Sequence, residues 1–311
     1  MISIKTTEEI LKTLSTRPLH PWEKNYLAHY SSYWQGIVTD PRLLLIPVDD
    51  HLVHRGDGVF EAFRTVDNKF YLLNEHLERL RYSAQSVGLS VSWSNEQIKE
   101  ILLGLRDIAK EPHLMFRLFV SRGTGGFTTN PYECPQSHLT IVACHFKPMA
   151  AEKYTAGVAI GRSQYLQKPE PFAGIKSCNY LPNVLMKKEA VDRKLDFVVA
   201  FTEKGFLTES STENIFLLSE NNQLLHPRYG SILRGTTLRR CLELAQSRLK
   251  LSVAETDISE AMLINAKEVF MAGTTLDVLP VAKYEKRDYS VGPVGSALRE
   301  LILDDQKQAP L

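Results

Sequence analysis

The sequence predicts a mixed fold, α+β or α/β, built from two domains. Its 311 residues are enough for two hydrophobic cores of ordinary size. Apolar segments of strand length alternate with amphipathic segments of helical length, and both hairpin-like and crossover connections join them. We expect a smaller N-terminal α/β domain over residues 1–146, which begins with a helical extension, a linker over 147–157, and a larger C-terminal domain over 158–311.

The first half is predicted to open with a helix and to continue with strands and two further helices. Thr6 begins a capping-box pattern ahead of the apolar positions of EEILKTL. Asn74 is the expected N-cap of a helix that stops at Gly88, and Ser94 begins a second capping box. Apolar runs separated by polar turns predict strands at residues 42–48, 58–66, 69–73, 114–121 and 138–146.

The second half repeats this alternation after the segment KPMAAEKYTAG, which contains a proline and has no strong apolar period. This segment is the expected linker. Strands are predicted for GVAIGRS, DFVVAFT, NIFLL, EVFMAGTT and DVLPVA. Helices are predicted after Pro182, for TTLRRCLELAQSRL and for GSALRELIL.

Composition and charge narrow the class of protein. The chain is 43% hydrophobic and 23% charged with a formal net charge of +1, which argues against a nucleic-acid or membrane-surface partner. The four cysteines form no CxxC pair, the N-terminus has no apolar secretion signal, and no apolar run approaches the roughly 20 residues of a membrane span. We therefore expect a cytoplasmic protein. No carboxylate or cysteine cluster accompanies His51 and His54, so no metal site is expected.

Lys176 stands alone among small and apolar neighbours in FAGIKSCNYL. Its stem is expected to be packed and its amine poorly solvated, which disfavours the ammonium form and lowers the pKa. A lysine of this kind becomes a nucleophile that can form a Schiff base. The alternative is a lysine whose amine reaches solvent from the end of a strand. The local sequence leaves both interpretations open.

Glu209 lies among small hydroxyl residues in FLTESSTENIF, after a predicted strand. A polar turn at this point could hold a carboxylate, and a pyridinium nitrogen needs such a partner to stay protonated and accept electrons. Taken alone, Glu209 is more simply interpreted as an ordinary turn residue.

Three features are typical of a site for phosphate or carboxylate. Thr236 and Thr237 follow a glycine at the start of an amphipathic helix, where free amides and hydroxyls bind anions. An ordinary helix cap has the same pattern. The Gly-Thr-Thr sequence recurs with Thr274 and Thr275. Arg79 in HLERL could supply a fixed positive charge, although a surface salt bridge explains it equally well.

Taken together and in this order, these motifs resemble the class IV pyridoxal-phosphate enzymes, also called fold type IV. That group contains branched-chain aminotransferases, D-amino-acid aminotransferases and 4-amino-4-deoxychorismate lyases. The matching stretches are HRGDGVFEAFR, HLERLRYSA, AGIKSCNYL, LTESSTENIF, LRGTTLR and VFMAGTTLDVLPV, which span residues 54 to 282. The resemblance implies a two-domain fold with pyridoxal 5'-phosphate (PLP) between the domains. It also implies a homodimer.

The resemblance implies a role for each matching residue. Lys176 would hold the aldehyde carbon of PLP as a Schiff base and then act as the base at the substrate Cα. Glu209 would pair with the ring nitrogen, and Tyr180 would lie near the ring hydroxyl, although it is one residue nearer to the lysine than in branched-chain aminotransferases. The implied cofactor-binding residues are Arg79, Lys176, Tyr180, Glu209, Thr236, Thr237 and Thr274. The implied substrate-binding residues are Arg117, Thr275 and Phe60.

The residues expected to bind the substrate match the subgroups unequally. Branched-chain aminotransferases carry a strand arginine six residues before a loop glycine, and Arg117 stands six residues before Gly123. Arg117 therefore binds a substrate carboxylate, pairs with a fixed acidic residue, or faces solvent. D-amino-acid aminotransferases have an Arg-x-His pair where this chain has Phe127 and Thr129, so that carboxylate trap is not expected.

The expected function is amino transfer to or from a branched-chain-like or related amino acid, through a lysine Schiff base and a quinonoid. One alternative is 4-amino-4-deoxychorismate lyase, which releases pyruvate and 4-aminobenzoate, because SRGTGG and the AGIKSCN spacing also resemble that group. A second alternative is a non-catalytic PLP-binding or structural protein. Such a protein is expected to lack the lysine or the glutamate, and this chain has both. The N-terminal 40 residues are expected to pack on the dimer or on the smaller domain.

Overall fold

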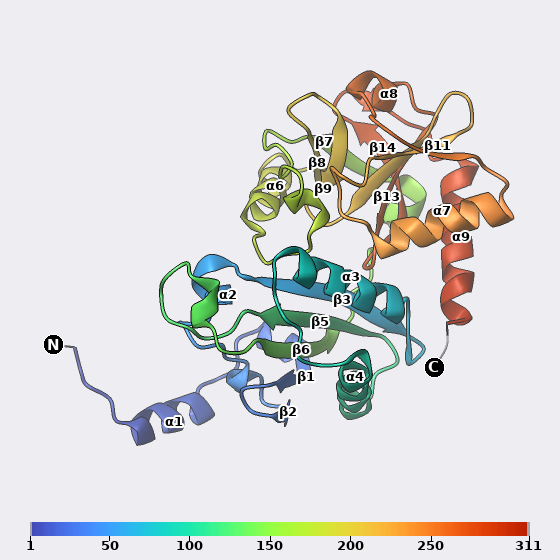
Figure 1. The fold of residues 1–311 in the computed structure, drawn as a ribbon. Helices are drawn as coiled ribbons and strands as arrows, with labels where there is room; N and C mark the ends of the chain where they lie inside the picture. The colour runs from blue at the N-terminus through green and yellow to red at the C-terminus, as the bar shows by residue number, and fades with distance from the viewer. Residues whose placement is uncertain (1, 310–311) are drawn as a thin grey trace.

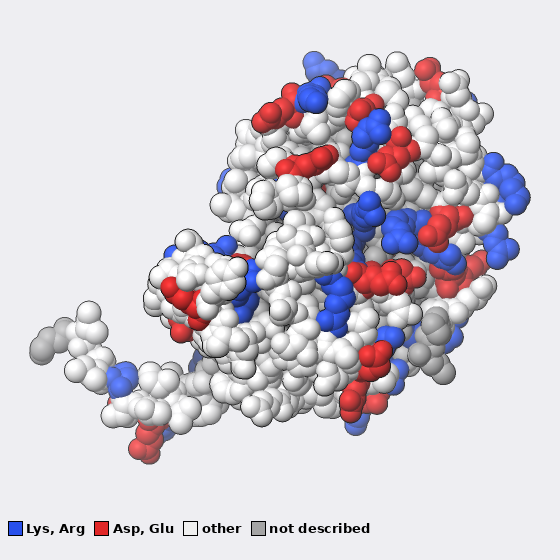
Figure 2. Space-filling view, in the orientation of Figure 1, with Lys and Arg blue, Asp and Glu red and all other residues white. Residues whose placement is uncertain are grey.

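The structure is a computed structural model that describes residues 2–309, and it contains one β-sheet in each half of the chain. In Figure 1 the first half lies below the second, and the helix α1 (Thr7–Thr16) extends away from both. Figure 2 shows acidic and basic side chains interspersed over the same face of the molecule. None of the helices within residues 2–309 has both the length and the apolar character that crossing a bilayer requires.

The first sheet has six antiparallel strands in the order β2-β1-β6-β5-β3-β4. The strands are β1 (Tyr26–Ser31), β2 (Gly36–Val38), β3 (Gly58–Val66), β4 (Lys69–Phe70), β5 (Leu114–Ser121) and β6 (His138–His145). The other elements of this half are α2 (His51–Arg55), α3 (Leu73–Ser86), α4 (Asn95–Ala109) and three short 3-10 helices, η1 (Glu23–Asn25), η2 (Pro41–Leu43) and η3 (Pro131–Glu133).

The two faces of strands β3 and β5 have different surroundings, because successive side chains in a strand point to opposite faces. One face carries apolar residues such as Phe63 and Phe116, which pack in one core with residues of α3 and α4 such as Leu77 and Leu102. The opposite face carries Phe60, Ala62 and Arg64 opposite Phe119, Arg117 and Met115. Four of these residues line the cavity described below: Phe60, Ala62, Met115 and Arg117.

The second sheet runs in the order β12-β11-β10-β13-β14-β7-β8-β9, with β15 attached to β14. An additional pairing of β9 with β10 closes six of these strands into a ring. The strands are β7 (Val158–Arg162), β8 (Phe197–Phe201), β9 (Leu207–Ser210), β10 (Asn214–Leu218), β11 (Leu224–Pro227), β12 (Val253–Thr256), β13 (Glu268–Gly273), β14 (Asp277–Tyr284) and β15 (Arg287–Asp288).

Helices cover this second sheet and connect its strands. They are α5 (Glu152–Ala156), α6 (Leu181–Asp192), α7 (Thr236–Arg248), α8 (Glu260–Ile264), α9 (Pro293–Lys307) and the 3-10 helix η4 (Phe172–Gly174). Leu238 of α7 and Leu298 of α9 share a core with Phe216 and Phe270 of the sheet. Figure 1 shows α7 and α9 side by side on one side of the sheet.

A short extended segment of the second half joins the first sheet. Val59 and Ser177 form an isolated antiparallel bridge. The Phe60 amide donates to the Lys176 carbonyl at 3.0 Å, and the Cys178 amide donates to the Gly58 carbonyl at 2.8 Å. This pairing fixes the backbone of Lys176 where the two halves of the chain meet.

Several sequence predictions about single elements are confirmed and others are wrong. The capping boxes at Thr6 and Ser94 are both present. Residues 42–48 are not a strand, because η2 and irregular backbone occupy them. Asn74 is not a cap, since α3 begins at Leu73 after Leu72 in a left-handed conformation. The strands β1, β2, β9, β11, β12 and β15 were not predicted.

The division into domains stays a prediction, and the sheets support it because each takes its strands from one half only. Residues 147–157 contain the helix α5, and Tyr154 in that helix packs against the core of the second half.

The N-terminal 40 residues differ in how they pack. Strands β1 and β2 are part of the first sheet, which agrees with the prediction that the N-terminal 40 residues pack on the smaller domain or on the dimer, whereas helix α1 contributes no buried residue. The packing of α1 on a second subunit stays a prediction.

Candidate active site

A cavity of about 190 Å³ lies between the two halves of the chain. Strands β3 and β5 and helix α3 form its wall on one side, and residues of the second half form the other. The wall contains all the predicted site residues except Glu209: Phe60, Arg79, Arg117, Lys176, Tyr180, Thr236, Thr237, Thr274 and Thr275. The structure therefore brings together residues that are up to 215 positions apart in the sequence, from Phe60 to Thr275.

Lys176 is buried, with 8% of its surface exposed. Its amine lies 4.5 Å from the centre of the Phe60 ring and donates to the Tyr180 hydroxyl at 3.4 Å. Burial and the nearby positive charge of Arg79 lower the pKa of Lys176 to about 8. The amine is therefore desolvated, and the alternative of a lysine that reaches solvent does not apply.

Glu209 lies on strand β9 and not in a turn, which corrects the sequence-based interpretation. Its Oε1 accepts from Gln167 Nε2 at 2.7 Å, and its Oε2 accepts from Asn214 Nδ2 and from the Leu233 amide, both at 3.1 Å. Burial nevertheless raises the pKa of Glu209 to about 7. Asn214 lines the cavity, so the carboxylate stands directly behind the cavity wall.

The N-terminus of helix α7 opens into the cavity. Gly235 is the N-cap and makes no side-chain hydrogen bond, so the amides of Thr236 and Thr237 have no acceptor within the helix. A Cβ atom on Gly235 would lie 1.8 Å from Asn214 Oδ1, so any other residue requires the loop or Asn214 to move. Unpaired amides and the helix dipole together make this end a place for an anion.

Arg79 lies within a buried charge cluster that the sequence did not reveal. Its Nε and Nη2 donate to the two oxygens of Glu61 at 2.7 and 2.8 Å, and its Nη1 donates to the Arg234 carbonyl at 3.0 Å. His76 Nδ1 lies 2.7 Å from Glu61, and His76 Nε2 shares a hydrogen bond of 3.2 Å with Thr236 Oγ1. The cluster thus connects α3 to the start of α7.

The electrostatics of this cluster keep a positive charge beside the helix end. Burial opposes ionisation of Glu61, but Arg79 and His76 outweigh it and hold the pKa of Glu61 well below its usual value. Burial lowers the pKa of His76. Arg79 therefore keeps its charge. Its hydrogen bonds to Glu61 and to the Arg234 carbonyl use only some of the five N–H donors of the guanidinium.

Arg117 projects from β5 into the cavity and is exposed. No Asp or Glu oxygen lies within 4 Å of its guanidinium among residues 2–309, so the interpretation as one half of a fixed ion pair is wrong. Ala62 lies directly opposite Arg117 in the sheet, and Phe60 lies two residues further along the same face. This wall thus carries a cation and an aromatic ring on the same face of the sheet.

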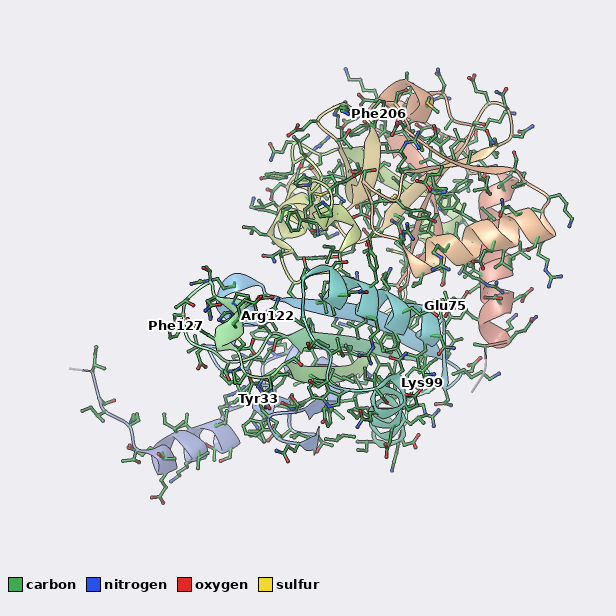
Figure 3. All side chains as sticks on the ribbon, in the orientation of Figure 1. Tyr33, Glu75, Lys99, Arg122, Phe127 and Phe206 are labelled. Carbon is green, nitrogen blue, oxygen red and sulfur yellow. The ribbon has the colours of Figure 1, made fainter. Side chains whose placement is uncertain are left out.

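Phe127 and Thr129, the positions of the D-amino-acid carboxylate trap, do not line this cavity. Phe127 is 62% exposed, and Figure 3 shows it at the edge of the first half, beyond Arg122. Thr129 lines a separate cavity with His51 and Arg55. Within residues 2–309 no three His, Cys, Asp or Glu side chains are grouped as metal ligands.

Sequence reasoning missed Glu61, His76, Gln167 and Asn214. Only two of them left a usable signal, since Glu61 interrupts an apolar strand and His76 stands three residues before Arg79, on the same helix face. Gln167 and Asn214 reach Glu209 through loops and strand pairing that the sequence does not show.

The residues present fit PLP. A buried amine of lowered pKa suits the aldehyde, the unpaired amides of α7 and the charge of Arg79 suit the phosphate, and a buried carboxylate suits the ring nitrogen. These three groups stand around one cavity or directly behind its wall.

Comparison with known proteins agrees with this chemistry. The family model described as amino-transferase class IV matches residues 58–284. The D-amino-acid transaminase, chloroplastic, of Arabidopsis thaliana is 30% identical over 92% of this chain and 78% of its own length. The branched-chain amino acid aminotransferase of Escherichia coli has a TM-score of 0.84 and 24% identity, covering 90% of this chain and 94% of its own.

A third comparison concerns the cofactor. A branched-chain amino acid aminotransferase of T.th., solved with pyridoxamine 5'-phosphate, has a TM-score of 0.84 and 22% identity and covers 92% of this chain and 95% of its own. Its fold is the fold of this chain. Because the family model covers most of the sequence, the chain belongs to the class IV aminotransferases, which are PLP-dependent enzymes.

Proposed function

We propose that this enzyme is an aminotransferase for a branched-chain-like or related amino acid, with Lys176 as the PLP-binding lysine and Arg117 as the carboxylate-binding residue. The observation that supports this most is the position of Arg117, a cation without an acidic partner within 4 Å among the described residues. The side chain of Arg117 lines the same cavity as Lys176. An arginine fork binds a carboxylate with two parallel hydrogen bonds.

Each part of the cavity has a separate task in this proposal. Lys176 Nζ would hold the aldehyde carbon of PLP. The amides and hydroxyls of Thr236 and Thr237 would hold the phosphate together with Arg79 and Thr274, and Glu209 would face the ring nitrogen. When bound, PLP supplies an electron-accepting ring that lowers the cost of removing the Cα proton of the substrate.

Lys176 would also move the proton. A pKa of about 8 leaves roughly a tenth of this amine uncharged at pH 7, and a base with a pKa near the working pH is effective. The uncharged amine would take the Cα proton of the substrate. Phe60 and Tyr180, which contact the amine, would limit the directions in which it can swing.

Tyr180 would remain a phenol during the reaction. Its pKa is raised above the usual value, mainly by burial and then by the charge of Glu209. A protonated hydroxyl 3.4 Å from the lysine amine can both accept from the ammonium and donate to an oxyanion. It would therefore orient the cofactor ring without adding a charge.

The stereochemistry and side chain of the substrate are selected, in this proposal, by Arg117 and Phe60. If Arg117 holds the carboxylate, the amino group must lie toward Lys176, and the side chain is left to contact Phe60, Ala62 and Met115. These neighbours are apolar and favour an aliphatic side chain. Phe127 and Thr129 lack the charge needed for a carboxylate trap of the other kind.

The test is a product assay with PLP, one amino acid and 2-oxoglutarate, run for the D and L forms of leucine, valine and alanine. We expect a branched-chain amino acid to give its 2-oxo acid, with matching formation of glutamate. If none of them reacts, and aminodeoxychorismate alone gives pyruvate without an oxo-acid acceptor, the enzyme is a lyase. No reaction with any of these compounds rejects both functions.

We also propose that the enzyme works as a homodimer in a reducing compartment such as the cytoplasm. The four cysteines are free in the structure, which suits a reducing compartment. Light scattering during gel filtration tests the dimer, with an expected mass of twice the 35.2 kDa chain. An active species of single-chain mass would contradict it.

A further inference from the structure

The connection between β13 and β14 brings Thr274 and Thr275 to the cavity. Gly273 pairs with Asp277 across the hairpin, so residues 274–276 form a three-residue loop. Asp277 has a φ of 55°, in the left-handed region that side chains other than glycine adopt at a cost. A residue persists in this conformation only where its surroundings hold it.

The side chain of Asp277 is held from both halves of the chain. Its Oδ1 accepts from Arg64 Nη2 and from Gln306 Nε2, each at 2.6 Å. Arg64 belongs to β3 of the first sheet, and Gln306 belongs to the last turn of α9. The three residues are all buried, with exposed fractions of 7%, 2% and 5% for Arg64, Gln306 and Asp277.

Arg64 is well placed to fix the loop relative to the cavity wall. It lies on the same face of β3 as Phe60 and Ala62, both of which line the cavity. Its guanidinium stands 4.7 Å from the centre of the Phe146 ring, which restricts its movement. The position of Asp277 is thus tied to the strand that carries one wall of the site.

Two further contacts hold the same loop and the same end of α9. Tyr154 of α5 donates from its hydroxyl to the Leu276 carbonyl at 3.1 Å. Asp305, next to Gln306, accepts from Tyr71 at 2.9 Å and from Arg240 Nε of α7 at 2.9 Å. The last turn of α9 therefore contacts the loop and helix α7, both of which reach the cavity.

We propose that Arg64 and Gln306 are positioning residues of the active site. By binding Asp277, they hold the loop 274–276 so that Thr274 and Thr275 face the cavity. This inference depends on the proposed function, in which Thr274 contacts the phosphate of PLP and Thr275 contacts the substrate. Neither Arg64 nor Gln306 lines the cavity, so each acts through Asp277.

The test compares three proteins with the unchanged enzyme. Gln306→Met removes one donor at nearly constant volume. The double variant Arg64→Met with Asp277→Asn removes the ion pair without leaving a single buried charge, and asparagine tolerates the left-handed backbone. Arg193→Met is the control, because Arg193 pairs with Glu285 just beyond the opposite end of β14.

Two measurements are made on each protein. Hydrogen exchange of residues 273–278 in the PLP-free protein reports the loop directly, and quenching of intrinsic fluorescence reports the Kd for added PLP. We expect exchange at least about tenfold faster and PLP affinity about tenfold weaker in Gln306→Met and in the double variant. The control is expected to match the unchanged enzyme in both.

The outcomes separate this inference from the proposed function. If loop exchange in both variants equals that of the unchanged enzyme, Arg64 and Gln306 do not position the loop, whatever the enzyme does. Faster exchange with unchanged PLP affinity also overturns the inference, because the loop then does not serve the site. Failure of the unchanged enzyme to bind PLP rejects the proposed function instead.

Discussion

Burial is the main cause of the lowered pKa of Lys176, and the charge of Arg79 adds to it. The Lys176 amine contacts an aromatic ring and a phenol but no carboxylate, and the more distant charges of Glu61 and Glu209 offset only part of the cost of desolvating the ammonium form. The apolar neighbours in the sequence predicted this lowered pKa. The partners Phe60 and Tyr180 could not be identified as contacts from composition or spacing.

Replacing Lys176 by methionine is expected to stabilise the PLP-free protein. A lysine with a pKa of about 8 when folded and 10.5 when unfolded binds its proton more weakly in the folded state. It therefore costs stability below pH 8, by at most about 3 kcal/mol, and the cost disappears as the pH rises toward 10.5. Urea unfolding of both proteins at pH 7 and pH 10 measures this. A difference that does not shrink with pH would contradict the expectation.

Replacing Glu209 by glutamine is expected to lower kcat about a hundredfold or more while changing the Kd for PLP less than tenfold. The amide keeps the shape and can still accept from Asn214 and Leu233, but it lacks the charge that keeps a ring nitrogen protonated. Glu209→Asp is the control that keeps the charge. Equal kcat for the glutamine variant and the unchanged enzyme would reject the assigned role.

Replacing Arg117 by glutamine is expected to lower kcat/KM for the amino acid by roughly 10 to 100-fold, because a charged hydrogen-bonded pair contributes about 1.5–3 kcal/mol. Arg117→Lys is expected to recover only part, since lysine cannot form the two-pronged contact. The matched control is the corresponding amine without a carboxylate, whose slow reaction is expected to be unaffected. If both substrates lose activity equally, Arg117 does not bind the carboxylate.

At the scale of elements, the start of α7 depends on a close approach of backbone and side chain. Gly235→Ala would bring a Cβ atom to 1.8 Å from Asn214 Oδ1, so the loop or Asn214 must move. We expect a lower Tm and weaker binding of PLP. Gly104→Ala in the middle of α4 is the control, because it meets only the end of a flexible Ile37 side chain and gains helix propensity of about 1 kcal/mol. Unchanged PLP affinity in Gly235→Ala would contradict the expectation.

The elements also differ in how well the sequence predicted them. Long apolar strands such as β5 and capped helices such as α4 carry their own signals, and both were predicted. Strand β9 has four residues, three of them polar, so no apolar alternation indicated it, although its partners β8 and β10 lie close to it in the sequence. Glu209 was therefore assigned to a turn, although the family resemblance indicated its role as partner of the ring nitrogen.

At the scale of the molecule, the site exists only because the two halves meet. Residues 58–60 pair with 176–178, and the buried Arg64–Asp277 pair joins β3 to β14. Motifs along the chain indicated which residues take part, through their resemblance to a family. The cluster of Glu61, His76 and Arg79 depends on packing of α3 against both halves, which no single segment encodes.

The most direct test of the central claim is reduction of the PLP-loaded protein with borohydride, followed by digestion and mass spectrometry. The account predicts one phosphopyridoxyl group per chain, attached to Lys176, and its loss in Lys176→Ala. Attachment to a different lysine, or no attachment under conditions that saturate the protein with PLP, would contradict the assignment of Lys176 as the residue that carries the cofactor.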